Sequence, residues 1–359
     1  MGGSMNSLQQ FLDSHPNLRF LFTGGKGGVG KTACAAALGY AFAQQGHRTL
    51  IASLNPVHSL SSVFGQELSG GTVRPVRGVE RLHAVEVEID DVVARYRDNI
   101  GRRVKDFLKW ADIPVDAKPF IDIAATNPAF EESAMFDKMM DIILSEGRDY
   151  DRIVFDTAAV ANAVRLIGLS KIYGLWLGRM IESRKEALSM RVQLAFRKEK
   201  IMEEVKKDPL MADLLAMHQR FEAVKGVLVD EQKTAFFFVT LPLALPIAVV
   251  RRFISMVQAY DIPVGGVLVN QVIPPELAAS AEEYLRNKYE EQQGYLAQIK
   301  GDLGPLVRGF VPLYQQEVNS LETVASVARD LFSYVPATWE QLEPRPSPKL
   351  ERVTGIMAA

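Results

Sequence analysis

The stretch GGKGGVGKT at residues 24–32 has the strongest chemical pattern in this sequence. It matches G-x-x-x-x-G-K-[ST], directly after an apolar run and directly before a helical pattern. Glycines at this spacing let backbone N–H groups turn towards phosphate oxygens, while the Lys31 ammonium reaches the β and γ phosphates and the Thr32 hydroxyl ligates Mg²⁺. The stretch therefore predicts a site for Mg²⁺ and a nucleoside triphosphate. The residues predicted to form it are Gly25, Lys26, Gly27, Gly28, Val29, Gly30, Lys31, Thr32 and Ala33.

An acidic residue at the end of another apolar run is a second candidate. Asp156 closes the run RIVFD, and a carboxylate at the end of a strand is suited to hold Mg²⁺ through a bound water. An acid in this place is alternatively an ordinary helix cap or turn residue. The phosphate-loop pattern in the same chain favours the magnesium role.

The elements that position these residues alternate between short apolar runs and amphipathic helical stretches. Near-continuous apolar strands separated by helices are typical of a parallel sheet covered on both faces. The sequence therefore predicts an α/β fold with a doubly wound, mostly parallel sheet, the class of P-loop nucleoside triphosphatases. The expected strands lie at 18–24, 49–54, 82–88, 152–158, 236–241, 265–272 and 307–313.

Two segments interrupt the alternation, at about 90–122 and about 162–230. Both are charged and helical in pattern, so we interpret them as helical insertions on one sheet and not as separate domains. Beyond Tyr334 the chain is rich in proline and has no periodicity. The predicted organisation is one P-loop domain over 1–335 and a proline-rich C-terminal tail over 336–359.

Charge and cysteine content exclude several classes of function. Lys and Arg total 41 against 43 Asp and Glu, so the net charge of −2 offers no global electrostatic basis for binding nucleic acid or an anionic membrane. Any such partner would need a local patch. The single cysteine, Cys34, excludes an internal disulfide, a cysteine-pair zinc site and an iron–sulfur cluster held by one chain.

No segment predicts an integral membrane protein. The most apolar run, 235–250, is shorter than the ~20 residues that a spanning helix needs, and Pro242 and Pro246 interrupt it. It is expected to form a buried strand, a turn and the start of a helix. The first four residues resemble a cloning remnant, and no secretory signal follows them, so a cytoplasmic location is expected.

Taken in order, several blocks resemble the family that includes the arsenite-pump ATPase ArsA and the ATPase that delivers tail-anchored membrane proteins. The resemblance covers most of residues 18–333. The blocks are GGKGGVGKT (24–32), SLNPVHSLSSVFG (53–65), GVERLHAVEVE (78–88), FDTAAVANAVRL (155–166), LVNQV (268–272) and VPLYQQEV (311–318). Membership implies ATP hydrolysis with Mg²⁺.

The resemblance also implies roles for particular residues. The early lysine of the loop, Lys26, marks the deviant Walker A ATPases, in which it crosses a homodimer interface to the other subunit's phosphates; alternatively it is a solvated loop lysine. Asn270 would read the adenine edge with Gln271 beside it, and Pro312 and Leu313 would pack against the base. Taken by itself, Asn270 is equally a turn-forming residue at a strand end.

Departures from the family pattern weaken some of these expectations. Asn55 stands where the family has the switch I aspartate, and an amide can bind a water but cannot accept its proton. With Lys26 and Lys31 it completes the predicted catalytic set, and hydrolysis is expected to be slow. In switch II the family's Pro, Thr, Gly and His are replaced by Ala159, Val160, Ala161 and Asn162. The zinc-binding cysteine pair of the targeting ATPases is absent, so no zinc is predicted.

The helices at 162–230 are the predicted surface for a hydrophobic membrane-protein client. Methionines are over-represented there, and flexible methionine suits varied apolar ligands; an ordinary helical core is the alternative.

Two other functions stay open. One is the ATPase subunit of an anion or arsenite pump, although a soft metalloid needs several thiolates and Cys34 is alone. The other is a nucleotide-dependent scaffold with little hydrolysis.

Overall fold

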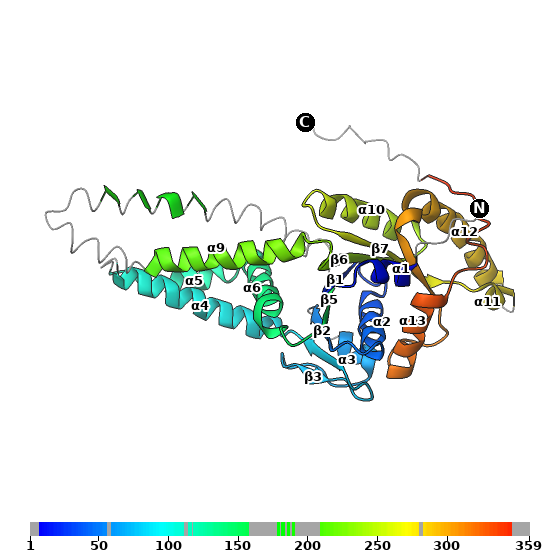
Figure 1. The fold of residues 1–359 in the computed structure, drawn as a ribbon, viewed down its shortest axis with the longest axis horizontal. Coiled ribbons are helices and arrows are strands. Elements are labelled where there is room, and N and C mark those ends of the chain that lie inside the picture. Colours follow the sequence, from blue (N-terminus) through cyan, green and yellow to red (C-terminus); the bar gives the residue numbers. More distant parts are fainter. Residues whose placement is uncertain are drawn as a thin grey trace.

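A central sheet of eight strands organises the chain in the computed structural model, which describes residues 7–55, 59–110, 114–116, 118–157, 209–279 and 283–346, with short pieces between 178 and 190 (Figure 1). The strand order is β3-β4-β2-β5-β1-β6-β7-β8, and every neighbouring pair is parallel except β3 and β4. The strands are β1 (Phe20–Gly24), β2 (Thr49–Leu54), β3 (Arg74–Pro75), β4 (Leu82–Glu86), β5 (Arg152–Thr157), β6 (Thr234–Thr240), β7 (Val264–Val272) and β8 (Val307–Pro312).

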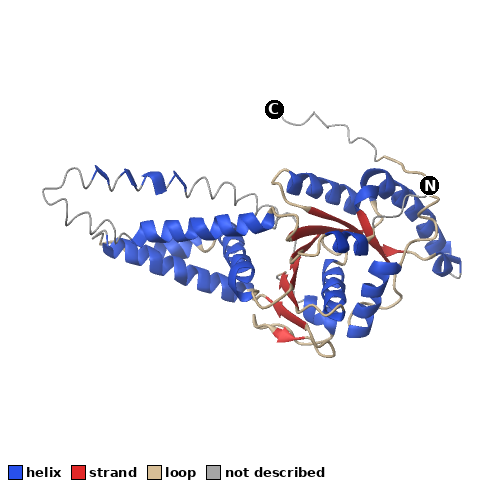
Figure 2. Ribbon diagram, in the orientation of Figure 1, coloured by secondary structure: helices blue, strands red, loops and turns tan. Residues whose placement is uncertain are grey.

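Helices cover both faces of the sheet, as the two colours of Figure 2 make plain. The helices are α1 (Leu8–Ser14), α2 (Lys31–Gln44), α3 (Ser59–Phe64), α4 (Ile89–Trp110), α5 (Lys118–Ala124), α6 (Pro128–Asp141), α9 (Pro209–Leu228), α10 (Ala244–Gln258), α11 (Pro275–Ala279), α12 (Glu283–Leu303) and α13 (Leu321–Ser333). A π-helical turn (Ile142–Glu146) follows α6, and a 3-10 turn (Gly304–Leu306) follows α12. None of the helices in the described part of the chain is both long and apolar enough to cross a membrane.

Two hydrophobic clusters, one on each face, explain why the strands are apolar at every position. On β1, Phe20 and Phe22 belong to the cluster that includes α10 and α12, whereas Leu21 between them belongs to the cluster formed with α1, α2 and α13. The rings of Phe22 and Phe155 stack at 4.6 Å. Strands buried on both faces need apolar residues on both, so the doubly wound α/β fold expected from the sequence is confirmed.

The helices α4, α5, α6 and α9 form a separate layer beside the sheet (Figure 1). α4 begins three residues after β4 ends, and it contacts α5, α6 and α9. The first insertion therefore runs further than the expected end at about 122, because α6 and the π-helical turn also precede β5. Of the second expected insertion, α9 is described, whereas 158–177 and 191–208 lie outside the described residues.

The start of the predicted tail packs against the domain. The Trp339 side chain is buried, and its ring meets the Phe310 ring of β8 edge-on at 4.8 Å. Lys300 of α12 donates through Nζ to the Trp339 carbonyl at 2.7 Å, and the Arg345 N–H donates to the Ala297 carbonyl at 3.0 Å. The boundary at 335 stays a prediction, and residues 347–359 lie outside the described residues.

Candidate functional site

The polar residues of the candidate site meet at the carboxyl edge of the sheet. The pairs β1–β5, β2–β5 and β2–β4 are parallel, and their register places Thr23 and Ser53 beside Asp156, and Ser53 beside Glu86. The carboxyl ends of these parallel strands lie at one edge, so four strands, β1, β2, β4 and β5, place hydroxyl and carboxylate groups side by side. In open α/β sheets this edge is where ligands bind.

The predicted phosphate loop joins β1 to α2 and is held tightly by its surroundings. Gly30 has a φ of 88°, and a Cβ there would lie 2.1 Å from Nδ2 of Asn270, so only glycine fits. Lys31 is 7% exposed, and its Nζ donates to the Lys26 carbonyl at 3.3 Å. Burial lowers the Lys31 pKa, and the nearby Asp156 opposes this shift. The Lys26 side chain, in contrast, is exposed at the loop tip.

A buried carboxylate sits directly beside the first turn of α2. The Thr32 hydroxyl donates to Oδ2 of Asp156 at 2.8 Å, and the Ser53 hydroxyl donates to the same oxygen at 3.3 Å. Asp156 is fully buried, and burial raises its pKa to about 6. Its other oxygen, Oδ1, has no hydrogen-bond partner.

These oxygen donors fit Mg²⁺. A hydroxyl and a carboxylate with one unused oxygen are hard ligands, and Mg²⁺ takes few protein ligands when phosphates and waters complete its shell. No cluster of three or more His, Cys, Asp or Glu that could hold a metal ion occurs in the described part of the chain.

Asn55 and a neighbouring serine approach the same point from β2 and α3. The Nδ2 of Asn55 donates to the Ser59 hydroxyl at 3.3 Å, and that hydroxyl lies 3.1 Å from the Thr32 hydroxyl. Ser59 was not among the predicted site residues, although it lies in the quoted switch I block. Pro56, Val57 and His58, between them, lie outside the described residues.

Glu86 is a second polar residue that sequence reasoning missed. The last residue of β4, it is buried, and its Oε1 accepts the Leu60 N–H at 2.7 Å and the Ser61 N–H at 3.0 Å. Oε2 accepts the Ser61 hydroxyl at 2.5 Å. A carboxylate inside the apolar run LHAVEV was a visible signal, because a buried charge needs such partners. Glu86 therefore fixes the start of α3, and with it Ser59, against the sheet.

A cleft of about 470 Å³ lies in front of the loop. Its size is within the range of small-ligand sites, ~300–1,000 Å³. It brings together most of the predicted nucleotide-binding residues. Those that line it are Gly28, Gly30, Lys31, Thr32, Ala33, Asn55, Asn270, Gln271, Pro312 and Leu313. Gly25, Lys26, Gly27 and Val29 belong to the same loop without lining the cleft.

Asn270 makes contacts that the sequence did not predict. Its Nδ2 donates to the Val29 carbonyl at 2.9 Å, and its Oδ1 accepts the Gln271 N–H at 2.9 Å. The amide thus ties the phosphate loop to the end of β7, while one N–H and one lone pair stay available. Gln271 has a φ of 57°, which a non-glycine residue adopts only when its surroundings hold it. The adenine-reading role of both residues stays a prediction.

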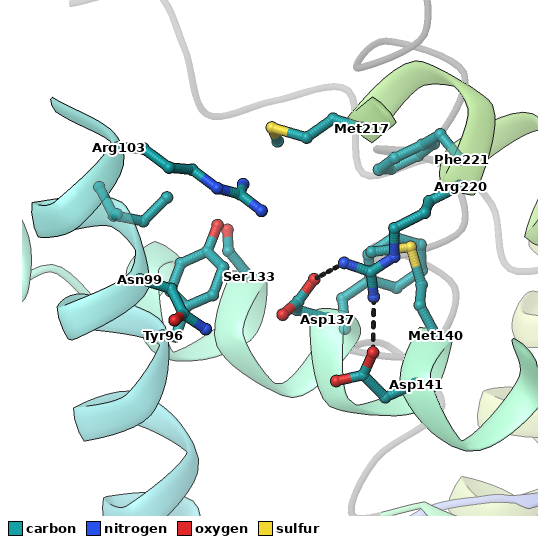
Figure 3. A pocket seen from close by; sticks show the side chains of 12 residues that line it. Tyr96, Asn99, Arg103, Ser133, Asp137, Met140, Asp141, Met217, Arg220 and Phe221 are labelled. Atoms are coloured by element: carbon teal, nitrogen blue, oxygen red, sulfur yellow. Dashed lines mark hydrogen bonds and ion pairs between the residues drawn. The ribbon is translucent and has the colours of Figure 1, made fainter. Parts of the chain in front are cut away.

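A second, smaller hollow of about 210 Å³ lies within the helical layer, between α4, α6 and α9 (Figure 3). Met217 and Phe221 of the predicted client surface line it. Among the lining residues, Arg220 pairs with Asp137 at 3.2 Å and with Asp141 at 2.7 Å (Figure 3). Burial raises the Asp141 pKa, an effect that Arg220 opposes.

The other residues of the predicted client surface divide into two groups. In the described part, Ile181 and Leu214 are buried, Met211 is half-buried, and Met190 and Leu215 are exposed. Those outside the described residues are Ile172, Tyr173, Leu175, Trp176, Leu177, Met180, Leu188, Val192, Leu194, Phe196 and Met202. The switch II positions Ala159, Val160, Ala161 and Asn162 also lie outside them.

Comparison with known proteins gives consistent matches over most of the chain. Residues 18–333 match the family model described as "Anion-transporting ATPase". The chain is 30% identical to ATPase GET3B of Arabidopsis thaliana over 320 residues, which cover 84% of this chain and 76% of the relative. It is 31% identical to ATPase GET3C of the same plant over 314 residues, covering 84% and 79%. A putative arsenical pump-driving ATPase 2 of Aquifex aeolicus is 24% identical over 314 residues, covering 88% and 99%.

Proposed function

Since this chain belongs to the anion-transporting ATPase family, we propose that it binds ATP with Mg²⁺ in the cleft at the sheet edge and hydrolyses it slowly. One observation carries the proposal. Residues from four separate segments line a single cleft: the phosphate loop, Asn55, the pair 270–271 and the pair 312–313. A glycine-rich turn with chance spacing would not gather them.

The roles of the residues follow from their positions. Backbone N–H groups of the loop and the Lys31 ammonium would bind the phosphates. Both belong to residues at the start of α2 that line the cleft, and both carry the positive charge or partial charge that attracts a phosphate. Thr32 would hold Mg²⁺ directly and Asp156 would hold it through water. A bound Mg²⁺ supplies charge stabilisation to the phosphate oxygens. Asn55 would orient a water through its amide without taking a proton.

We further propose a cytoplasmic homodimer that shields a hydrophobic client. Lys26 is exposed at the loop tip, where a partner subunit's phosphates could meet it. The helical layer follows β4 directly, so nucleotide state at the sheet edge has a short path to the hollow that Met217 and Phe221 line. The resemblance to the tail-anchored-protein-targeting ATPases supports this client class.

The two loop lysines test the proposal, because they separate ATP binding from dimerisation. Lys31→Ala should weaken ATP binding about 10- to 100-fold in calorimetry with Mg²⁺, since a charge-assisted hydrogen bond to phosphate contributes about 1.5–3 kcal/mol. Lys26→Ala should keep most of the affinity and lose ATP-dependent dimerisation in sedimentation. Unchanged affinity in Lys31→Ala would refute the ATP site; unchanged dimerisation in Lys26→Ala would refute the bridging role.

A scaffold that cycles with little hydrolysis is the second candidate, and Asn55 favours it because no proton acceptor replaces the family's aspartate there. The pump subunit has less support. Cys34 is fully buried, and burial raises its thiol pKa to about 12, so it does not supply the thiolate that a soft metalloid requires.

A further inference from the structure

A broad groove of about 1,280 Å³ runs between α4 and α5 in the helical layer, apart from the nucleotide cleft. Five cationic side chains line it: Arg97, Arg102, Lys105, Lys109 and Lys118. Three carboxylates line it as well, those of Asp98, Asp116 and Asp122, so the groove is net positive in a chain whose net charge is −2. This is the local basic patch that the overall charge does not reveal.

The groove uses the face of α4 opposite the small hollow. Tyr96, Asn99 and Arg103 line that hollow, whereas Arg102, Lys105 and Lys109 line the groove. The spacing of each set, three to four residues, places it along one side of the helix. Two separate hollows are therefore lined by opposite faces of one helix.

The groove cations lack ion-pair partners in the described part of the chain. Arg103, on the other face of α4, does have an acidic partner in the helical layer: its Nε lies 3.9 Å from Oδ2 of Asp213. Lys105 and Lys109 are four residues apart, and like charges at this spacing repel and destabilise the helix. An anionic partner would relieve this repulsion.

Apolar side chains are interleaved with the cations. Leu108, Val115 and Ile121 line the groove, and Val115 is 52% exposed. Ile123, on the same short helix as Ile121, is 70% exposed. A partner that covers this groove gains from apolar burial as well as from charge pairing, so it must itself be amphipathic.

We propose that the α4–α5 groove binds an acidic, amphipathic peptide segment of a partner protein. The groove is a hollow lined by α4 residues from Arg97 to Lys109 and by residues 114–122, which fits an inserted segment better than a flat membrane surface. The apolar side chains of the groove make no favourable contact with a phosphate backbone, so a bound nucleic acid would leave these side chains exposed to water. This surface is distinct from the client hollow and does not depend on ATP binding.

A defined peptide tests the proposal. The probe is a fluorescein-labelled helix of about 18 residues with Leu at helical spacing and Glu elsewhere, and its match is the same peptide with Lys in place of Glu. Fluorescence anisotropy with the full chain should show binding of the Glu peptide that weakens with salt, and at least ~10-fold weaker binding of the Lys peptide. The triple variant Arg102→Gln/Lys105→Gln/Lys109→Gln should lose at least ~10-fold in affinity for the Glu peptide.

A matched control is available on other surfaces. Lys225→Gln/Lys233→Gln/Lys288→Gln removes the same charge from exposed ion pairs elsewhere and should leave the affinity unchanged. ATP turnover should stay unchanged in both triple variants, and the salt dependence of the native chain provides a reading if the groove variant misfolds. Equal affinity of native and groove variant, or tighter binding of phosphatidylserine vesicles or an oligonucleotide than of the Glu peptide, would overturn the proposal.

Discussion

The proposed slow hydrolysis depends on Asn55. Its amide donates to the Ser59 hydroxyl, which in turn lies beside the Thr32 hydroxyl, so the amide lies next to the proposed Mg²⁺ and phosphate site, where it would order a water. An amide has no basic site for the water's proton. The chemistry of phosphoryl transfer depends mainly on position and charge, which is why slow turnover is expected and not its complete absence.

Restoring the acid at this position should therefore raise turnover. Asn55→Asp should increase ATP hydrolysis by at least ~10-fold, because general base catalysis typically contributes about 10²–10⁴-fold. The rate would be measured by phosphate release at saturating Mg²⁺ and ATP, with Asn55→Ala as the control that removes both amide and acid. Equal rates in the native chain and Asn55→Asp would show that Asn55 is no handicap.

The buried charge of Asp156 lowers the stability of the folded protein, and this effect should depend on pH. Burial raises its pKa to about 6, above the model-peptide value of 3.8, so the folded chain holds this proton more tightly than the unfolded chain does. The stability contributed by this group therefore falls as pH rises from about 4 to about 6 and is lowest above that range. The proposed Mg²⁺ site would compensate for this cost, because the metal ion would favour the ionised carboxylate.

Asp156→Asn should then stabilise the protein without nucleotide and Mg²⁺. At pH 7.5 we expect a gain of about 1–3 kcal/mol in urea unfolding, shrinking towards pH 4, because the amide still accepts the Thr32 hydrogen bond without a buried charge. Exposed Asp149→Asn serves as the control. A variant less stable than the native chain at pH 7.5 would mean that the Asp156 charge is net favourable.

At the residue scale, motifs are enough to predict which residues lie together where the motif sets the geometry, but not where tertiary contacts set it; the chemical roles of these residues stay predictions. The phosphate-loop pattern and the strand-end acid were enough to expect Thr32 and Asp156 near one another. Ser59 and Glu86 depend on how α3 docks against β4, which no local spacing encodes. The Asn270 bond to the Val29 carbonyl likewise joins positions 241 residues apart.

At the scale of secondary-structure elements, the short helix α3 is held by a single distant residue, Glu86. It has six residues, too few to be stable alone, and the Glu86 carboxylate accepts two of its first N–H groups. Glu86 also ends the strand that leads into α4. It therefore connects the switch I segment to the root of the helical layer.

Glu86→Gln should loosen this connection. An amide offers one acceptor oxygen and a competing NH₂ group, so buried partners of the carboxylate are left unsatisfied; we expect a loss of about 1–3 kcal/mol in urea unfolding. If Glu86 also positions Ser59, kcat should fall more than the affinity for ATP changes. Loss of stability with unchanged kcat would assign Glu86 a purely structural role, and Ser61→Ala separates the hydroxyl contact from the rest.

Strands with a long apolar run in the sequence were predicted, whereas a very short strand was not. All seven expected strands are present because each is a continuous apolar run buried on both faces. The two-residue β3 is too short to leave a pattern. The helices between 128 and 146 were not predicted; they extend the helical layer beyond 122, and their buried residues, such as Met139 and Ile143, belong to the hydrophobic cluster that also includes residues of the sheet.

For the molecule as a whole, the segment after α13 decides where the domain ends. Composition marks 336–346 as an extension, yet Trp339 lies in the larger hydrophobic cluster and its carbonyl accepts a hydrogen bond from Lys300. Gly301 allows the chain to pass closely, since a Cβ there would lie 2.5 Å from the Arg345 carbonyl oxygen. Low periodicity is therefore compatible with an ordered strap over α12.

Trp339→Ala tests whether this strap is part of the fold. Removing a buried tryptophan should cost about 3–5 kcal/mol in urea unfolding, because Phe310 on the edge strand β8 loses its cover. Tyr284→Ala, at a site 72% exposed, is the matched aromatic control, and its free energy of unfolding should change little.

Two truncated chains, one ending at 346 and one ending at 335, measure the contribution of this segment without creating a cavity. The difference between their free energies of unfolding is the stability contributed by 336–346. If the two truncations unfold alike and Trp339→Ala matches Tyr284→Ala, the domain ends at 335 and the contacts on β8 contribute nothing; a difference of several kcal/mol would extend the domain across Trp339.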